Sequence, residues 1–309
     1  MAAKTWTNTP NSGVDELLFH NDTVALCLLV NRRHSTLRII DFRAGPTLAK
    51  RSFVVAAAKR EGVEKVFTLV ERDEVATWTR LGFTREGSIP SFYKRSDAWI
   101  LGAVVSQIGP VRAPHASMDD DEDEGGEARA ASPAAALAER TIARARRLLK
   151  STSEAMFPAV KLAPASEAWA RKALSTAQRS GRALTGFEPF SRDVERRVFT
   201  LSTRGGYTVT ASVETQACFG NSFFELLIGP RTEPERLAAT SAVRALEARL
   251  KDEGAVSTFT LAVADDVTQA AVFLGAGFRR SGVLAQHVML KGERKDVIVW
   301  SKKLVGAGD

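Results

Sequence analysis

Apolar and polar positions divide the chain into short strand-like runs and longer helical ones, in an order that recurs in its two halves. In the first half the expected strands cover 24–30, 36–42, 66–70 and 98–105, and the expected helices cover 45–62 and 73–80. In the second half the expected strands cover 198–203, 208–215, 222–228, 259–263 and 297–302, and the expected helices cover 233–253 and 267–274. Hairpin strands followed by alternating strands and helices predict the α/β class, with a mixed, mostly antiparallel sheet flanked by helices in each half.

The ends of the two halves also carry a repeated sequence passage. The matching positions are 67–69 with 259–261, 81–83 with 276–278, Gly87 with Gly282, and Asp97 with Asp296. Self-similarity of this length predicts two tandem copies of one domain type.

The two copies are separated by a stretch of different composition. Residues 108–134 contain three prolines, a glycine pair and the acidic run 119–127. Such a stretch cannot bury enough apolar surface to fold, so it predicts a linker between domains at 1–107 and 135–309. A basic helix with one apolar face is expected at 134–150. It either packs between the domains or is held by the nearby acidic run.

Composition fits two globular domains. Of the 309 residues, 44% are hydrophobic, which is enough for two cores. Cys27 and Cys218 each lie in an apolar run and are expected to be buried small hydrophobes. Their number favours a reducing compartment. With no hydrophobic leader near the N-terminus and no membrane-length apolar run, we expect a cytoplasmic protein that does not contact a membrane. No metal-type spacing of Cys and His is present, so no metal is expected.

Charge becomes informative when the linker is separated from the rest. The acidic run holds seven acids and no base, so the remainder is more basic than the net charge of +7 indicates. A basic body attracts anions such as coenzyme A, nucleic acid or acidic partners. However, the Lys and Arg residues are spread along the chain and no nucleic-acid motif is present, so nucleic-acid binding is not expected. Like charges keep the acidic run open and solvated.

Two phrases carry a resemblance to a known family. Residues 270–304 read AAVFLGAGFRRSGVLAQHVMLKGERKDVIVWSKKL, and residues 87–102 read GSIPSFYKRSDAWILG. With the element order, these phrases resemble the GNAT acetyltransferases, and within them the two-domain β-lysine ε-N-acetyltransferases. The resemblance implies tandem GNAT-like domains, acetyl-CoA as cofactor, and acetyl transfer to a primary amine of a small amino acid or diamine.

The resemblance places the coenzyme A loop of the second half at GPRTEPERLA, 229–238. Its candidate cofactor-binding residues are Gly229, Arg231, Thr232 and Arg236, together with Phe273, which stands where related enzymes often carry a Tyr. The further glycines of the family loop are absent, so the loop is degenerate. Thr232 and Glu235 instead have capping-box spacing, which would satisfy the helix N–H groups internally.

The first half offers an alternative loop, RAGPTLAKRSF, at 43–53. Its candidate residues are Arg43, Gly45, Lys50 and Arg51. Their charge suits an anion, although a lone Gly-Pro before a helix is typical of a simple turn.

The amine end needs a group that takes a proton from the ammonium. Of the groups available near it, Glu225 and Glu214 lie on strands, and Asp265, Asp266 and Gln269 lie at a helix start. Glu225 is a candidate catalytic residue together with Gln286 and His287, which occupy polar positions in the penultimate segment, and His287 could contact a substrate. Asp266 also has the position of a helix N-cap. Three functions therefore stay open: an N-acetyltransferase, a catalytically inactive GNAT pair that binds a small molecule, and an adaptor that binds a protein partner through the acidic linker and basic helix. The two domains are also candidates for pairing with each other.

Overall fold

The computed structural model describes residues 3–8, 13–22, 24–42, 45, 47–108, 132–192 and 194–304, with the backbone alone at 3–8. The predicted linker at 108–134 lies outside the described residues except at its two ends. The division into domains at 1–107 and 135–309 therefore stays a prediction.

Both halves contain every strand and helix that the sequence pattern predicts, together with several that it did not. The first half forms β1 (Ala3–Asn8), β2 (Val14–His20), β3 (Ala25–Asn31), β4 (Thr36–Asp41), α1 (Leu48–Arg60), β5 (Lys65–Val70), η1 (Arg72–Glu74), α2 (Val75–Arg80), β6 (Thr84–Ile89), β7 (Ala98–Val104) and η2 (Val105–Gln107). The second forms α3 (Pro133–Lys150), η3 (Glu154–Met156), β8 (Val160–Ala165), α4 (Glu167–Arg179), β9 (Glu195–Thr203), β10 (Thr208–Gln216), β11 (Asn221–Leu226), α5 (Glu233–Asp252), β12 (Ser257–Val263), α6 (Val267–Gly275), β13 (Arg279–Leu290) and β14 (Glu293–Lys303).

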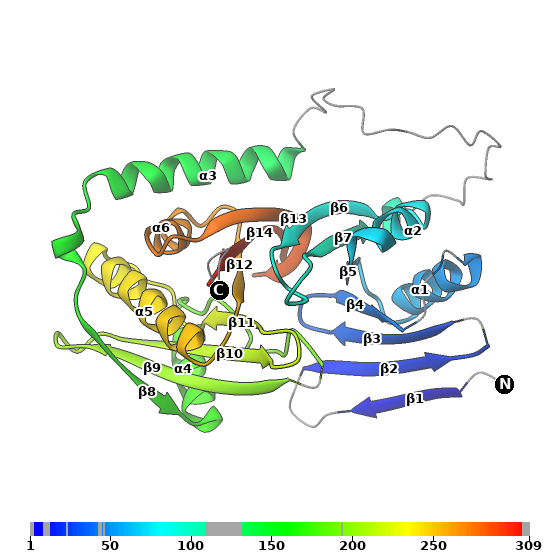
Figure 1. Cartoon of the computed structure of the whole chain (residues 1–309), viewed down its shortest axis with the longest axis horizontal. Coiled ribbons are helices and arrows are strands. Elements are labelled where there is room, and N and C mark those ends of the chain that lie inside the picture. The colour runs from blue at the N-terminus through cyan, green and yellow to red at the C-terminus, as the bar shows by residue number, and fades with distance from the viewer. Residues whose placement is uncertain are drawn as a thin grey trace.

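The described strands join one sheet, in the order β1-β2-β3-β4-β5-β7-β6-β13-β14-β12-β11-β10-β9-β8. Two neighbouring pairs are parallel, β4 with β5 and β11 with β12, and the other described pairs are antiparallel. Figure 1 shows α1 and α2 beside the strands of the first half, and α3, α5 and α6 beside those of the second. The structure thus confirms the α/β class and a mixed, mostly antiparallel sheet with helices in each half.

The two halves contact each other through matching positions of the sequence repeat. Gly87 of β6 pairs directly with its counterpart Gly282 of β13. A Cβ atom built on Gly87 would lie 2.6 Å from the Gly282 Cα, closer than real Cβ atoms approach another heavy atom. Only glycine at both positions therefore allows the two strands to come this close.

The repeat also holds at the following turn. Ser91 and Gln286 both have a left-handed backbone, with φ of 53° and 50°. In each copy an aspartate holds the turn, since Asp97 Oδ1 accepts from Ser91 N at 2.7 Å and Asp296 Oδ1 accepts from Gln286 N at 2.8 Å. The residue after each turn is buried: Phe92 in the first copy and His287 in the second. The aspartates matched in the sequence thus have the same structural role.

Each half has its own apolar core, and a third cluster spans both. That third cluster combines Phe67 and Phe92 of the first half with Phe223, Phe259 and Val297 of the second. Phe92 lies against Phe259, with ring centroids 5.8 Å apart, and His287 lies against Phe67 at 4.8 Å. Because these contacts cross between the halves, the two halves pack against each other there.

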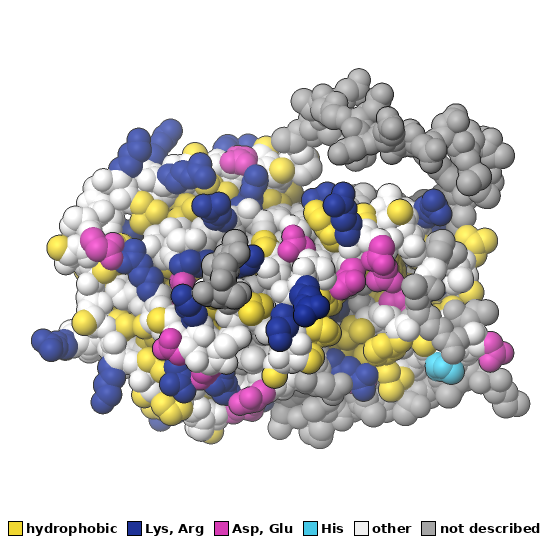
Figure 2. Space-filling model, viewed as in Figure 1, with side chains coloured by type: hydrophobic (Ala, Val, Ile, Leu, Met, Phe, Trp, Pro, Cys, Tyr) yellow, Lys and Arg dark blue, Asp and Glu magenta, His cyan; other side chains and the backbone are white. Residues whose placement is uncertain are grey.

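The basic helix α3 packs against the second half. Ala138, Ile142 and Ala145 on its apolar face belong to the core of that half. Its Lys and Arg side chains face solvent, and Figure 2 shows them gathered along the upper left of the molecule, where Figure 1 places α3. In the described part of the chain no helix is both long and apolar enough to cross a membrane.

Candidate functional site

Strands β11 and β12 open a gap toward the first half. The two strands pair in parallel only from Asn221 to Phe223 of β11 and then separate. A cavity of about 120 Å³ lies at this separation, with walls from both halves. Its charged and imidazole-bearing lining residues are Arg33, His34, Arg38, Glu188, Glu225 and His287.

Glu225 of β11 is the acid at the separation of the strands. Its carboxylate accepts from the Thr185 hydroxyl at 2.6 Å and from the Ser212 hydroxyl at 3.3 Å. The side chain is 18% exposed, and burial raises the pKa of Glu225 to about 7, a shift that the Thr185 hydrogen bond and the nearby Arg196 only partly oppose. Glu225 therefore exchanges its proton near neutral pH.

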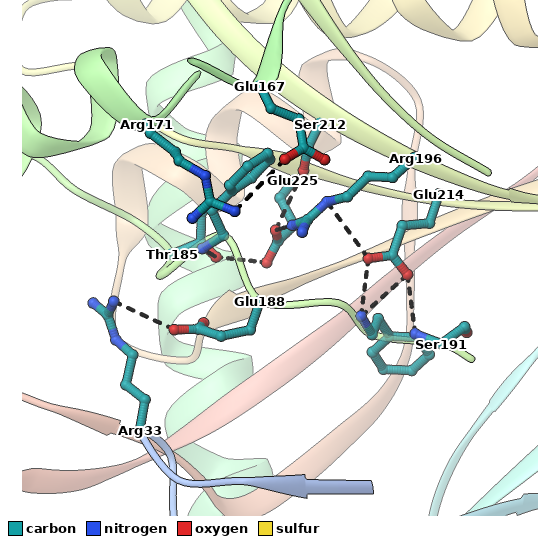
Figure 3. Close-up of polar contacts among 12 residues, drawn as sticks. Arg33, Glu167, Arg171, Thr185, Glu188, Ser191, Arg196, Ser212, Glu214 and Glu225 are labelled. Carbon is teal, nitrogen blue, oxygen red and sulfur yellow. Dashed lines mark hydrogen bonds and ion pairs between the residues drawn. The ribbon is translucent and has the colours of Figure 1, made fainter. Parts of the chain in front are cut away.

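Arg196 lies between two carboxylates, as Figure 3 shows. Its guanidinium is 3.9 Å from Glu225 and 3.8 Å from Glu214, and it stacks over the Phe187 ring at 3.7 Å. Glu214 also accepts from the backbone N–H groups of Phe190 and Ser191. Burial still raises the pKa of Glu214 above its usual range. One arginine thus serves two buried acids, and neither acid is fully compensated.

Residues 182–191 begin with a short segment that pairs with residues 227–229, directly after β11. Leu184 N donates to Leu227 O at 3.1 Å, and Gly229 N donates to Arg182 O at 2.8 Å. The same segment carries Thr185 and Glu188 to the cavity. We call residues 182–191 the strap.

The strap also reaches the N-terminus of α5, where the resemblance placed the coenzyme A loop. Thr232 caps the helix, and Glu235 accepts from Arg231 N at 2.7 Å and from the Arg182 guanidinium at 2.7 Å. The Arg231 side chain donates to Ser180 O, and Arg236 is buried against Thr152 and Glu233.

The predicted loop residues Gly229, Arg231, Thr232 and Arg236 therefore lie together, and most of their hydrogen-bonding groups are engaged inside the chain, except the buried Nη1 of Arg236, which has no partner among the described residues. A pyrophosphate at this helix end would have to displace the Glu235 carboxylate and part of the strap, so the loop does not fit one in this conformation. Phe273, the fifth predicted residue, is fully buried in the core of the second half, next to Phe224 and Trp300.

The alternative loop of the first half is engaged in a similar way. Lys50 is buried, forms an ion pair with Asp41 and donates to Gly45 O at 3.0 Å. Arg51 Nε donates to Leu81 O at 3.0 Å. Arg43 lies outside the described residues. The described charged side chains of this loop, Lys50 and Arg51, are therefore engaged inside the chain.

The structure separates the remaining catalytic candidates. A bulge in β13 between Leu284 and Val288 turns His287 into the cavity and leaves Gln286 exposed. His287 is 5% exposed, and burial lowers its pKa well below the usual range, so the imidazole is neutral. Asp266 caps α6 by accepting from Gln269 N at 2.8 Å, as its sequence position predicts. Glu225 and His287 thus share one cavity, and Gln286 faces away from it.

Sequence reasoning missed the residues that the strap and the first half contribute. Thr185, Glu188, Arg33, His34 and Arg38 belong to no motif, and their sequence neighbours give no catalytic pattern. Two contacts bring them to the cavity. The strap pairs with the chain directly after β11, and β13 contacts the turn before β4, where Met289 N donates to His34 Nδ1 at 3.3 Å. In the described part of the chain, no group of three or more His, Cys, Asp or Glu side chains is arranged to hold a metal.

Comparison with known proteins finds solved N-acetyltransferases that resemble part of the chain with low TM-scores. No protein-family model matches the chain, and no curated protein matches it. The spermidine N-acetyltransferase from Vibrio cholerae, solved with CoA and spermine, is 12% identical, with 47% of this chain and 95% of that chain covered at a TM-score of 0.40. The ribosomal-protein-S18-alanine N-acetyltransferase from Escherichia coli is 14% identical, with 49% and 97% covered at a TM-score of 0.38. These values are too low to assign an activity to this chain.

Proposed function

We propose that this chain is an N-acetyltransferase that modifies a primary amine bound in the cavity between its halves. The observation that carries the proposal is the position of Glu225, a carboxyl group with a pKa of about 7 at the separation of β11 and β12. The resemblance of 270–304 to the β-lysine ε-N-acetyltransferases supports the same reaction class. Division of the chain into domains at 1–107 and 135–309 is part of this proposal, as is a cytoplasmic location.

Glu225 suits the proton transfer that amine acylation needs. A free amine has a pKa of about 10.4 and is protonated at neutral pH, so it must lose a proton before it can attack a carbonyl carbon. A carboxylate whose conjugate acid has a pKa near 7 accepts that proton more readily than an ordinary one, by about 3 kcal/mol. Thr185 and Ser212 donate to the Glu225 carboxylate and hold it in place.

The other cavity residues would position the amine and exclude water. The Glu188 carboxylate, 3.5 Å from Arg33, adds negative charge to the cavity wall. The aromatic ring of Phe67 and the neutral imidazole of His287 shield the site from solvent. A low-dielectric site of this kind strengthens the attraction between a bound ammonium and Glu225.

The acetyl donor that the resemblance implies is acetyl-CoA, which supplies the acetyl group as a thioester. The closed strap and the self-capped α5 favour a second candidate function, in which the chain binds an amine without acetyl transfer. The catalytic candidate must also bind acetyl-CoA, which requires the strap to release residues 227–229 and the N-terminus of α5.

A direct assay separates the two candidates. The full-length protein is incubated with acetyl-CoA and a panel of diamines and amino acids, and free thiol release and acetylated amine are both measured. Turnover by the native protein that falls at least tenfold in the variant Glu225→Gln would support the acetyltransferase function. Amine binding by calorimetry without turnover would support the binding function, and turnover unchanged in Glu225→Gln would refute the role of Glu225.

A further inference from the structure

Arg38 of the first half is a buried cation without an acidic partner. The residue is 8% exposed and lines the cavity. Among the described residues no carboxylate oxygen lies within 4.0 Å of its guanidinium, whereas Arg33 on the same wall pairs with Glu188. Burial lowers the pKa of Arg38 to about 10, so the group still carries its charge at neutral pH. The Glu214 carboxylate attracts Arg38 from beyond contact distance, but no described carboxylate contacts the guanidinium. A buried charge without a contacting partner is costly, and the carboxylate of a ligand could supply that partner.

The Arg38 guanidinium makes hydrogen bonds along one edge and none along the other. Nη1 donates to Phe190 O at 2.6 Å and to the Ser191 hydroxyl at 2.9 Å, and the group stacks over the Phe190 ring at 4.6 Å. These contacts fix the plane of the guanidinium. Nε is buried without a hydrogen-bond partner, and Nη2 makes no hydrogen bond within the described part of the chain. The Nε–Nη2 edge of an arginine is a fork that matches the two oxygens of a carboxylate.

The imidazole of His287 also lines the cavity and also has an atom without a hydrogen-bond partner. His287 Nδ1 is buried and makes no hydrogen bond to the described residues. A neutral imidazole can donate one N–H to an anion. Arg38 and His287 come from different halves and line one cavity, and each has a buried polar atom without a hydrogen-bond partner among the described residues. This pair of atoms indicates a built anion subsite.

We propose that the cavity binds an amino acid, whose carboxylate pairs with Arg38 of the first half and whose amino group lies at Glu225 of the second. This inference rests on the proposed function only in placing an amine at Glu225. It makes the first half a source of specificity: a ligand with a carboxylate fills the Arg38 fork, and a diamine or polyamine leaves it empty. Leaving a buried polar group unpaired typically discriminates strongly against the ligand that lacks its partner.

Matched ligand pairs test the inference on the unmodified protein. Calorimetry without acetyl-CoA compares lysine with cadaverine, ornithine with putrescine, and arginine with agmatine, since each pair differs only by the carboxylate. We expect at least one amino acid to bind ten times or more tighter than its decarboxylated partner. Inorganic phosphate, measured in parallel, is expected to bind more weakly than that amino acid.

Variants of Arg38 then show whether its guanidinium fork causes the preference for the amino acid. Arg38→Gln is expected to weaken binding of the amino acid tenfold or more and to leave its decarboxylated partner unchanged. Arg38→Lys keeps the charge without the fork, and its affinity for the amino acid is expected to lie between those of the native protein and Arg38→Gln. Arg85→Gln is the matched control, because Arg85 is exposed and stacks on Trp99 away from the cavity. Thermal unfolding shows whether each variant is folded.

Several outcomes would overturn the inference. These are a panel in which no amino acid binds, equal affinity for both members of every pair, phosphate binding tighter than any amino acid, or amino-acid binding that a folded Arg38→Gln variant retains. The result is separable from the proposed function. An amino acid that binds through Arg38 without being acetylated would refute the enzyme alone, and acetylation of diamines and amino acids with equal affinity would refute this inference alone.

Discussion

Replacing Glu225 by Gln is expected to stabilise the protein at high pH and to leave its stability almost unchanged at low pH. The pKa of Glu225 is raised to about 7 in the fold from 4.5 in an exposed chain. The folded state therefore holds the Glu225 proton more tightly than the unfolded state. Below pH 4.5 the carboxyl is neutral in both states and costs nothing. Between pH 4.5 and 7 the unfolded chain loses the proton first, so the stability of the native protein falls as pH rises.

Above pH 7 the full cost is present. A shift of this size corresponds to about 3 kcal/mol at roughly 1.4 kcal/mol per pKa unit. This cost is already net of the attraction to Arg196 and of the Thr185 hydrogen bond, which both oppose the shift. Gln keeps the size of the side chain and the bond to Thr185 but carries no charge, so it avoids the cost.

Urea unfolding of the native protein and of Glu225→Gln at pH 4.5, 6, 7 and 8 measures this difference in free energy of unfolding. We expect the difference to grow by about 2–3 kcal/mol from the lowest to the highest pH. Glu195→Gln is the control, because its carboxylate is 72% exposed, and it should show no such growth. A difference that stays constant with pH, or that favours the native protein at pH 8, would refute the assignment of a buried, poorly compensated carboxyl at this position.

Three further changes test other parts of the account. Gly87→Ala places a Cβ 2.6 Å from the Cα of the partner strand and is expected to lower the free energy of unfolding by about 2 kcal/mol or more, whereas Gly205→Ala, whose Cβ would have no neighbour closer than 3.8 Å, should cost under about 1 kcal/mol. Asp296→Ala removes the bond that holds the β13 bulge and should cost about 1 kcal/mol in the same urea assay; an unchanged midpoint would contradict it. Arg182→Ala loosens the strap from Gly229 O and Glu235, so acetyl-CoA affinity by calorimetry should rise, whereas Arg179→Ala should leave it unchanged; equal affinity in both variants would show that the strap does not compete.

The elements that sequence reasoning found are those with a strong local pattern. Strand β12 and helix α5 are apolar on the side that they bury, so a window of residues predicts them. Strand β6 reads TREGSI and has no such pattern. It is a strand because it lies between β7 and β13, and a local window does not contain that neighbour. Helix α4 was predictable and was missed, since Ala170, Leu174 and Ala177 follow a helical period.

One local expectation was wrong. Cys218 lies in an apolar stretch of the sequence and was expected to be buried, but it is exposed. It sits in the turn between β10 and β11, where the chain reverses and the side chains leave the sheet. Cys27, in the middle of β3, is buried as expected.

The candidate site was predictable only in part. Glu225 is a plausible proton acceptor from its type and its strand, but its raised pKa comes from burial, which depends on how elements distant in sequence pack around it. Arg38 carries no sequence signal, because its lack of an acidic partner appears only when the two halves are packed together. The repeat was the most productive sequence feature, since the pairing of Gly87 with Gly282 locates the contact between the halves.

The central claim is that Glu225 accepts the proton of an amine in the cavity between the halves. The pH dependence of kcat/KM for acetyl-CoA-dependent acetylation tests it most directly, with an amine that the protein binds. We predict that kcat/KM rises with pH along a limb with a pKa of about 7. In Glu225→Gln we expect this limb to disappear and at least nine-tenths of the rate at pH 8 to be lost. A limb that persists in the variant, or amine binding with no acetylation at any pH, would contradict the claim.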